Sequence, residues 1–261
     1  MPEITPERAT HFTRRALALV DKGSSSIAEI DHVSRSRHPL SYGSVLEIGC
    51  GTGGFLLAGS EKFDRVIGTD LSMAWLVIAR KRLEERGVEG FLACAGAEHL
   101  PFRSGAFDLV VAEDVIEHVQ DQERTMQECA RVLGKAGILF LATPNRFSFT
   151  PEPHVGLWGV GFLPRRWMSR YVRWARGVTY DDIRIVSYFE LTGLLSRARF
   201  KNYHVVLPAL NADEVSGFSP LKRRLVPLYD FLRGQPVFRP FLLVSGPFFH
   251  VFGYGGERPA S

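Results

Sequence analysis

The sequence has few cysteines and no long apolar run, and each shortage excludes a class of protein. Its three cysteines are an odd number without metal-type spacing, which argues against a disulfide framework and fits a reducing compartment. No window of about 18 apolar residues is free of charges and prolines, so no transmembrane helix is expected. The first residues also lack the charged-then-apolar pattern of a signal sequence. These absences together predict a cytoplasmic protein.

The totals are those of an ordinary globular chain. The 261 residues are enough for one large domain, or for one domain with an insertion. Hydrophobic residues make up 45% and charged residues 23%, which is typical of globular proteins. The formal net charge of +4 is mildly basic and does not by itself identify a partner.

Residues 45–54 read Val-Leu-Glu-Ile-Gly-Cys-Gly-Thr-Gly-Gly, a short apolar strand followed at once by glycines. Such a run predicts a tight strand-to-helix turn on which no side chain blocks a ligand from reaching the backbone. The helix that begins near Phe55 then points its free N–H groups at that ligand. Gly49, Gly51 and Gly54 also match the dinucleotide fingerprint, so the turn alone does not identify the ligand.

Two features of this stretch favour a ligand that contains an amino acid. Glu47 lies in the strand two residues before the first glycine, where its carboxylate can meet an ammonium group rather than a pyrophosphate. The glycines also recur as Gly49, Gly51 and Gly53, which leaves room for an amino-acid moiety.

Four further motifs follow in order along the chain. Together with the glycine stretch they are residues 45–53, 68–70, 97–102, 107–119 and 131–133. Their order and spacing resemble class I S-adenosylmethionine (SAM)-dependent methyltransferases over about residues 40–150. The resemblance implies SAM as cofactor, S-adenosylhomocysteine as product, and a Rossmann-like, doubly wound, mostly parallel seven-stranded α/β sheet with helices on both faces.

The resemblance also implies which residues hold the cofactor. Asp70 ends the second strand 21 residues after Gly49, where its carboxylate can accept from both ribose hydroxyls. The family usually has an acid at position 96 for the adenine, but this chain has Gly96, so Ala97 and Glu98 are the expected substitutes. The predicted cofactor-binding set is Glu47, Gly49, Cys50, Gly51, Gly53, Asp70, Leu71, Ala97, Glu98 and Glu113.

The pattern of the chain predicts three regions. Residues 1–43 form a helical segment, with a helix from Thr5 to Asp21, a break at 23–26 and a second short helix over 27–33. Residues 44–207 form the SAM-binding domain, with a proline-rich, substrate-covering insertion at 144–184. Residues 208–261 form a hydrophobic and basic extension on the substrate side.

Within the domain, strands and helices alternate as a doubly wound sheet requires. The predicted strands are 45–48, 65–70, 91–95, 107–112, 137–143 and 202–207. The predicted helices are 54–61, 72–86, 122–133 (with Gly134 as its C-cap) and 187–198.

Histidines carry the predicted chemistry, because methyl transfer requires an in-line approach and the removal of one proton from a protic acceptor. His118 is a candidate general base, together with His154 from the insertion. The alternative for His118 is a structural pairing with Glu117, and for His154 a solvated loop position. A further alternative is that Asp114, Glu117, His118 and His154 bind Mg²⁺ or Mn²⁺, as in metal-assisted O-methyltransferases; no metal is assigned from the sequence.

Residues 164–176 combine aromatic and basic side chains. Trp167, Tyr171 and Trp174 recur at i, i+4 and i+7, and five arginines share the segment with no acid. Core packing, an interfacial helix on an anionic membrane and a nucleic-acid groove all fit this pattern. Residues 237–252 predict a hydrophobic flap over an apolar substrate, so both segments are candidates for peripheral contact at the inner membrane face.

The sequence therefore predicts a SAM-dependent methyltransferase that acts on a small or lipid-linked acceptor at oxygen. Three alternatives stay open: a metal-assisted RNA 2′-O-methyltransferase, a non-catalytic SAM-binding scaffold, and an NAD-dependent enzyme. Nucleic acid is the less favoured partner, because no RNA-binding module is visible. The oligomeric state is not predicted.

Overall fold

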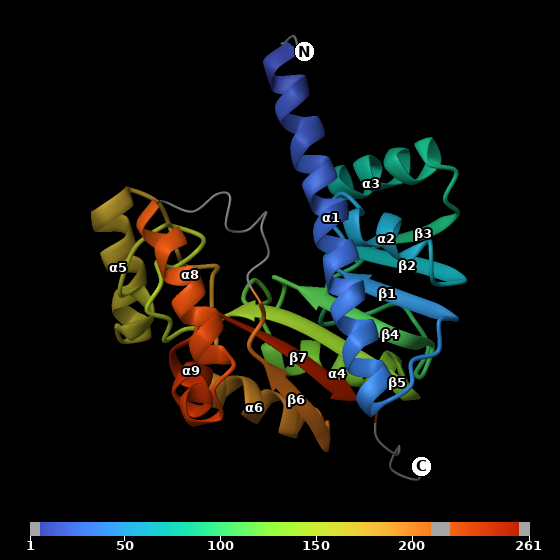
Figure 1. Ribbon diagram of the computed structural model, residues 1–261. Helices are drawn as coiled ribbons and strands as arrows, with labels where there is room; N and C mark the ends of the chain where they lie inside the picture. The colour runs from blue at the N-terminus through green and yellow to red at the C-terminus, as the bar shows by residue number, and fades with distance from the viewer. Residues whose placement is uncertain (1–5, 210–219, 256–261) are drawn as a thin grey trace. The chain divides into compact units, whose positions relative to one another are not determined.

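The computed structural model describes residues 6–209 and 220–255 (Figure 1). Its strands are β1 (Ser44–Ile48), β2 (Arg65–Asp70), β3 (Gly90–Cys94), β4 (Phe107–Glu113), β5 (Leu133–Pro144), β6 (Asn202–Val206) and β7 (Phe248–Tyr254). Its helices are α1 (Pro6–Arg37), α2 (Gly54–Gly59), α3 (Met73–Glu85), α4 (Gln122–Val132), α5 (Arg165–Arg176), α6 (Tyr188–Arg197), α8 (Pro220–Arg233) and α9 (Arg239–Ser245), with short 3-10 turns at Val160–Phe162 and Pro236–Phe238.

The strands form one seven-stranded sheet in the order β3-β2-β1-β4-β5-β7-β6. Strand β1 pairs in parallel with β2 and β4, and Ile48 lies between Thr69 and Ala112 in the register. The strand order reverses direction at β1, so the turn that follows β1 leaves the sheet where open α/β sheets bind their ligands. The predicted doubly wound α/β architecture is confirmed.

The chain divides into two compact units. The first comprises the described parts of Met1–Ala112, Gln127–Phe140 and Tyr254–Ser261, and the second comprises Glu113–Met126 and the described parts of Leu141–Gly253. The predicted regions 1–43, 44–207 and 208–261 stay a prediction. One difference from the expected flap is clear, because residues 248–252 lie in strand β7, with Phe249, Val251 and Phe252 buried.

Helix α1 is continuous from Pro6 to Arg37, so the predicted break at residues 23–26 is wrong. Gly23 is a contact point rather than a helix end, since a methyl group there would lie 2.7 Å from the Cα of Phe55 in α2. The serine hydroxyl of Ser25 donates to the Asp21 carbonyl within the helix, at 3.0 Å. Packing of α1 against α2 therefore outweighs the weak helix propensity of the Gly-Ser run.

A matched pair of glycine substitutions tests this account. We expect Gly23→Ala to lower the free energy of unfolding by about 1–3 kcal/mol, because the added methyl meets backbone atoms. In α6 a methyl at Gly193 would meet only the flexible guanidinium of Arg197, so Gly193→Ala should raise stability by about 0.5–1 kcal/mol. Urea denaturation measures both, and equal effects of the two substitutions would contradict the proposed close packing.

Most predicted bounds differ from the observed ones by a few residues. Strand β2 has the predicted bounds, and Ser72 caps α3 by accepting from the Trp75 N–H. Trp75 and Ile78 in α3 are 46% and 40% exposed. Gly134 lies inside β5 rather than at the end of a helix.

Within residues 6–209 and 220–255, none of the helices combines the length and the apolar character that a bilayer span requires.

Candidate functional site

The glycine turn, residues 49–54, follows β1 in the first unit. Gly49, Gly51 and Gly53 have φ angles of 69°, 48° and 74°, in the left-handed region that favours glycine. At Gly51 no atom lies within 4 Å of the point where a Cβ would stand, so the backbone is open to a ligand there. This open turn fits an amino-acid or nucleoside group.

Asp70 holds the glycine turn. Its Oδ2 accepts from the Gly51 N–H at 2.9 Å, and its Oδ1 accepts from the Ser72 N–H at 2.8 Å. Each carboxylate oxygen has a second lone pair that remains available to a ligand hydroxyl. From α3, Arg82 donates to the carbonyl and to the hydroxyl of Thr52, both at 2.7 Å. Asp70 therefore both shapes the turn and presents acceptors at its edge.

Two members of the predicted cofactor set, Cys50 and Leu71, differ in where their side chains lie. Cys50 is 4% exposed, and burial raises the pKa of its thiol, so the thiol is unreactive. Its Sγ lies only 2.8 Å from where a Cβ on Gly68 would stand, so Cys50 offers a ligand its backbone alone. Leu71 is 75% exposed, and its Cδ2 lies 3.6 Å from where a Cβ on Gly96 would stand, beside the predicted adenine loop.

Loop 97–102, the predicted adenine loop, is anchored by α4. Glu128 Oε2 accepts from the Leu100 N–H at 2.9 Å. Arg131 donates to the carbonyls of Leu100 and Phe102, at 2.9 and 2.6 Å, and pairs with Glu128 at 2.7 Å. Ala97 is buried in this loop. The sequence prediction missed Glu128, although its i, i+3 spacing from Arg131 on a helix is a recognisable signal.

The remaining acidic members of the predicted set lie on strands or beside the loop. Glu47 is half-buried in β1, between Gly68 on β2 and Val111 on β4. Glu113 is the last residue of β4 and is half-buried. A methyl on Gly96 would lie 3.2 Å from the Glu98 carboxylate, so Glu98 stands close to the position where the family has its usual acid.

The second unit contains the His cluster, which we define as Glu117, His118, Glu152 and His154. The two Nε2 atoms of His118 and His154 lie 3.1 Å apart, with the rings edge to face. His154 Nδ1 lies 2.5 Å from Glu152 Oε1, and Glu152 Oε2 accepts from the Val155 N–H at 3.0 Å. The two predicted catalytic histidines, 36 residues apart in the chain, are thus in direct contact.

The electrostatics of the two histidines differ. Burial lowers the pKa of His118, and so does the neighbouring His154. Burial lowers the pKa of His154, but its hydrogen bond and attraction to Glu152, together with the charges of Glu117 and Asp114, raise it, so the net shift is upward. With Nδ1–H of His154 donating to Glu152, the Nε2 lone pair of the neutral ring faces His118. That arrangement accepts a proton shared between the two rings.

Glu117 is fully buried beside the histidines. Its Oε2 accepts from the Thr143 hydroxyl at 3.0 Å, whereas Oε1 has no hydrogen-bond partner among the described residues. Burial, followed by the charge of Asp114, raises its pKa to about 7. One ligand atom each from Glu117, His118 and His154 lie within 4.8 Å of one another. This donor set fits a divalent cation; Asp114, the fourth predicted ligand, is not part of it.

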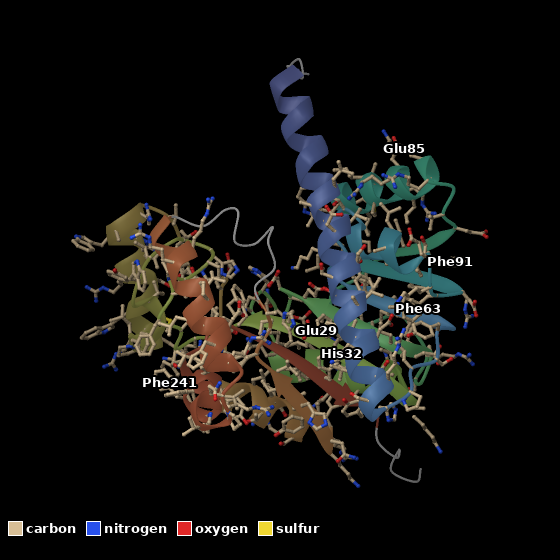
Figure 2. The ribbon with its side chains drawn as sticks, viewed as in Figure 1. Glu29, His32, Phe63, Glu85, Phe91 and Phe241 are labelled. Carbon is tan, nitrogen blue, oxygen red and sulfur yellow. The ribbon has the colours of Figure 1, made fainter. Side chains whose placement is uncertain are left out.

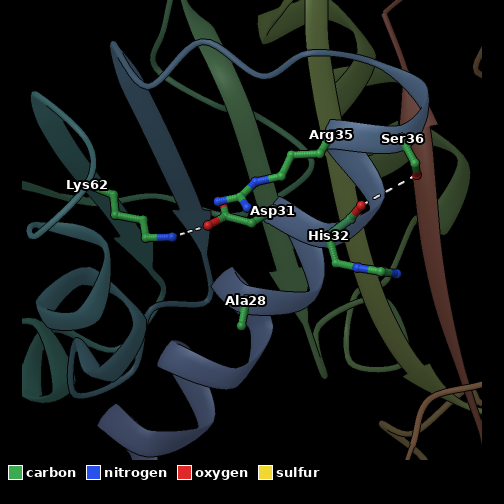
Figure 3. A pocket seen from close by; sticks show the side chains of 6 residues that line it. All are labelled: Ala28, Asp31, His32, Arg35, Ser36 and Lys62. Atoms are coloured by element: carbon green, nitrogen blue, oxygen red, sulfur yellow. Dashed lines mark hydrogen bonds and ion pairs between the residues drawn. The ribbon is translucent and has the colours of Figure 1, made fainter.

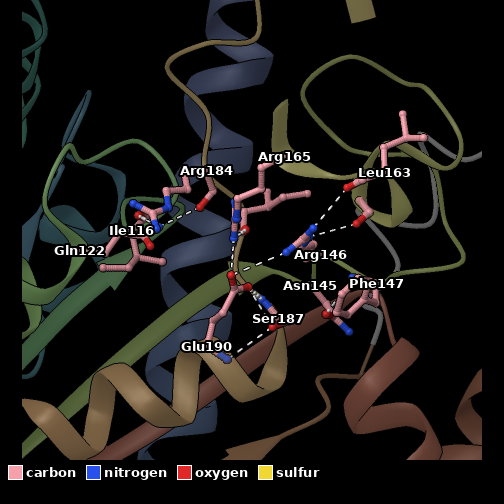
Figure 4. Close-up of polar contacts among 12 residues, drawn as sticks. Ile116, Gln122, Asn145, Arg146, Phe147, Leu163, Arg165, Arg184, Ser187 and Glu190 are labelled. Atoms are coloured by element: carbon pink, nitrogen blue, oxygen red, sulfur yellow. Dashed lines mark hydrogen bonds and ion pairs between the residues drawn. The ribbon is translucent and has the colours of Figure 1, made fainter. Parts of the chain in front are cut away.

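Hydrogen bonds from the Gln122 side chain and from the Arg184 N–H hold the turn that carries Glu117 and His118; Figure 4 shows Gln122, Ile116 and Arg184. Gln122 Nε2 donates to the carbonyls of Ile116 and Arg184, at 2.9 and 2.7 Å. The Arg184 N–H donates to the Glu117 carbonyl at 2.7 Å. The sequence prediction missed both Gln122 and Glu152. Glu152 has a local signal, since it stands two residues before His154 between prolines.

A polar recess of about 450 Å³ on α1 lies apart from the groups described so far (Figure 3). Lys62 pairs with Asp31, and the Tyr42 hydroxyl also donates to Asp31 at 2.7 Å. The Ser36 hydroxyl donates to the His32 carbonyl. The Asp31–Lys62 pair in this recess attaches α1 to the loop after α2, which is a structural role.

Comparisons with known proteins agree with this geometry. Residues 46–141 match the family model described as "Methyltransferase domain". A ubiquinone biosynthesis O-methyltransferase of Cronobacter sakazakii is 27% identical over 62% of this chain and 63% of its own length. A probable S-adenosylmethionine-dependent methyltransferase of Mycolicibacterium smegmatis is 36% identical over 45% of this chain and 44% of its own. The chain thus spans less than two thirds of the length of these curated relatives.

A solved structure extends the similarity to nearly the whole chain. It is a SAM-dependent methyltransferase from Thermotoga maritima, described as a possible histamine N-methyltransferase, with 25% identity. The match has a TM-score of 0.55 and covers 95% of this chain and 96% of that one. Residues 46–141 therefore carry a methyltransferase domain, and these matches support the predicted class I SAM-dependent methyltransferase family and SAM as its cofactor.

Proposed function

We propose that this protein transfers the methyl group of SAM to an oxygen of a small or lipid-linked acceptor. The observation that carries the proposal is the pair of facing histidines, His118 and His154, backed by the Glu152 carboxylate. A hydroxyl acceptor must lose a proton when its oxygen attacks the methyl carbon, and a histidine pair of this kind accepts one. The O-methyltransferase name of the Cronobacter relative supports the choice of oxygen.

The cofactor supplies an electrophilic methyl on a sulfonium, and the chain's residues position it. Asp70 would accept from the ribose hydroxyls, and Glu47 would meet the ammonium group of the methionine part. The open backbone at Gly51 leaves room for the ligand to approach. Within the first unit, the register sets Ala112 of β4 beside Ile48, the last residue of β1.

The proton balance of the reaction is simple. The acceptor O–H bond breaks, a C–O bond forms, and the sulfonium becomes the neutral thioether of S-adenosylhomocysteine. The proton passes to the His118–His154 pair, and Glu152 stabilises the resulting imidazolium through His154 Nδ1–H. Solvent then takes the proton, because the two histidines are not fully buried.

A second candidate mechanism uses a divalent cation, and the buried Glu117 Oε1 favours it. Glu117, His118 and His154 would hold the ion, whose contribution when bound would be to lower the pKa of an acceptor hydroxyl. In that case the histidines act as ligands rather than as bases.

Tritiated SAM and three acceptor classes test the proposed function. We expect label to transfer to a phenol such as 3,4-dihydroxybenzoate, with little transfer to histamine or to total RNA. Transfer to RNA alone would favour a nucleic-acid methyltransferase, and transfer to the amine alone would exclude oxygen as the target. Binding of S-adenosylhomocysteine without transfer to any extractable acceptor of the cell would favour a scaffold.

The role of Glu152 gives a separate prediction. Glu152→Gln removes the charge behind His154 but preserves most of the volume, so we expect kcat to fall about 10- to 100-fold. Affinity for S-adenosylhomocysteine, measured by calorimetry, should stay unchanged, since the glycine turn belongs to the first unit. A loss of cofactor affinity together with kcat would indicate that the substitution disturbs the fold instead.

A further inference from the structure

Helix α5 in the second unit has one buried face. Met168 and Val172, 3% and 0% exposed, pack with Val160 and Tyr180 in a small core. Of the three aromatic residues of the helix, only the half-buried Tyr171 packs against this core, so core packing does not explain the exposure of Trp167 and Trp174.

An aromatic stripe, Trp167, Tyr171 and Trp174, flanks the buried face of α5 and presents its two tryptophans to solvent. Trp167 and Trp174 are 52% and 83% exposed, and Tyr171 stacks against Trp174 with ring centroids 6.2 Å apart. Together with Leu163 and Arg170 these side chains line an open, mainly apolar recess of about 440 Å³. Large aromatic side chains exposed in this number and density mark an interaction surface.

An arginine stripe runs beside the aromatic one. Arg166, Arg170 and Arg173 repeat the same i, i+4, i+7 spacing one position earlier, and all three are exposed. Arg173 makes only a long, exposed pair with Asp181, at 3.5 Å. Arg166 and Arg170 have no acidic partner in the part of the chain that the structure describes. The helix contains no acid, so this surface is positively charged.

Exposed phenylalanines begin next to the recess in the sequence, because Phe162 directly precedes Leu163. Phe162, next to Leu163, stacks with Phe149, and Phe149 stacks with Phe241 of α9, whose position Figure 2 shows. The three are 49%, 58% and 56% exposed. A row of stacked, exposed phenylalanines therefore runs from the 3-10 turn Val160–Phe162, which precedes α5 in the chain, to α9.

We infer that the second unit docks on an anionic phospholipid surface through the aromatic and arginine stripes of α5. Tryptophan and tyrosine favour the boundary between headgroups and acyl chains, where a ring with one polar atom is accommodated best. Arginines beside them can pair with lipid phosphates, because the planar guanidinium donates two parallel hydrogen bonds to two oxygens of one phosphate. A helix with an apolar stripe flanked by cations, and too short and charged to span, lies in the plane of the interface.

The docked helix also supports the loop that carries His154. Arg176 donates to the Gly156 carbonyl at 3.1 Å, and the Tyr171 hydroxyl donates to the Trp158 carbonyl at 3.2 Å. Val155 and Leu157 pack against the small core under α5. Membrane docking therefore brings loop 151–158 close to the lipid surface, which suits a lipid-linked acceptor. This last consequence rests on the proposed function, whereas the docking itself does not.

Vesicle co-sedimentation of the full chain tests the docking. We expect binding to vesicles of phosphatidylcholine with phosphatidylglycerol, weak binding to phosphatidylcholine alone, and release at high ionic strength. Arg166→Gln with Arg170→Gln should weaken binding about 30-fold. Trp167→Ser with Trp174→Ser should weaken it on the order of tenfold or more.

A control of equal charge change is Lys81→Gln with Arg86→Gln, on exposed positions in and next to α3, which should bind vesicles like the wild type. All variants should keep their affinity for S-adenosylhomocysteine and the urea midpoint of the wild type, and the midpoint shows that the second unit, which contains α5, still folds. Equal binding to neutral vesicles, or wild-type binding by both α5 variants, would overturn the inference. Light scattering provides a further test. If the wild type is a dimer and the double variant Trp167→Ser, Trp174→Ser is a monomer, a second copy of the chain occupies this surface and the inference is overturned.

Discussion

Replacing Asp70 by alanine is expected to weaken binding of S-adenosylhomocysteine by at least about 100-fold. Two charge-assisted hydrogen bonds to the ribose would be lost, each contributing about 1.5–3 kcal/mol. The same carboxylate accepts from the Gly51 and Ser72 N–H groups, so its removal also loosens the glycine turn. Isothermal titration calorimetry of the purified chain measures the change directly.

Two further variants separate the contributions of Asp70. Asp64→Ala removes an exposed acid near β2 and should leave affinity unchanged, which controls for net charge. Asp70→Asn keeps one carbonyl acceptor and should fall between the wild type and Asp70→Ala. An Asp70→Ala variant that binds with wild-type affinity would remove this residue from the cofactor site.

Replacing His118 by alanine is expected to lower kcat by about 10²–10⁴-fold, the usual contribution of a positioned general base. His154→Ala should have a comparable effect, because the two Nε2 atoms lie 3.1 Å apart and accept one proton between them. The double variant should be little slower than either single one, since residues that act as a unit are not additive. Single-turnover kinetics with tritiated SAM measure each rate.

Chelation distinguishes the two roles of these histidines. If His118 and His154 together act as the general base, treatment with a chelator leaves the wild-type rate unchanged and Glu117→Gln retains most activity. If they are ligands, the chelator removes activity, Mn²⁺ restores it, and Glu117→Gln weakens Mn²⁺ binding in calorimetry. Full activity in both His118→Ala and His154→Ala would exclude either role.

The alternating core was predictable because its signals are local. Strand β2 ends in Asp70 and helix α3 starts at its Ser72 cap, and both are read from a few adjacent residues. The continuity of α1 was not predictable, since Gly23 is favoured there only by its contact with Phe55, 32 residues later. In the same way, the contact of His118 with His154 depends on the path of the insertion, which no periodicity encodes.

The exposed stripe of α5 also could not be predicted from sequence periodicity. Spacing at i, i+4 and i+7 reveals that three aromatic residues share a face, but not whether that face meets the core or water. The structure gives that information: Met168 and Val172 occupy the buried face, Tyr171 lies at its edge, and Trp167 and Trp174 are exposed. Helical periodicity identifies faces, and only the tertiary packing assigns them.

The sheet order has a consequence for biosynthesis. Strand β7 lies between β5 and β6, although it is made after both of them. While the ribosome is still adding residues before Phe248, β5 has an unpaired edge and β6 has no neighbour in the sheet. Such edges recruit strands from other chains, so nascent copies of this protein are most open to aggregation, and to chaperone capture, until the final strand closes the gap.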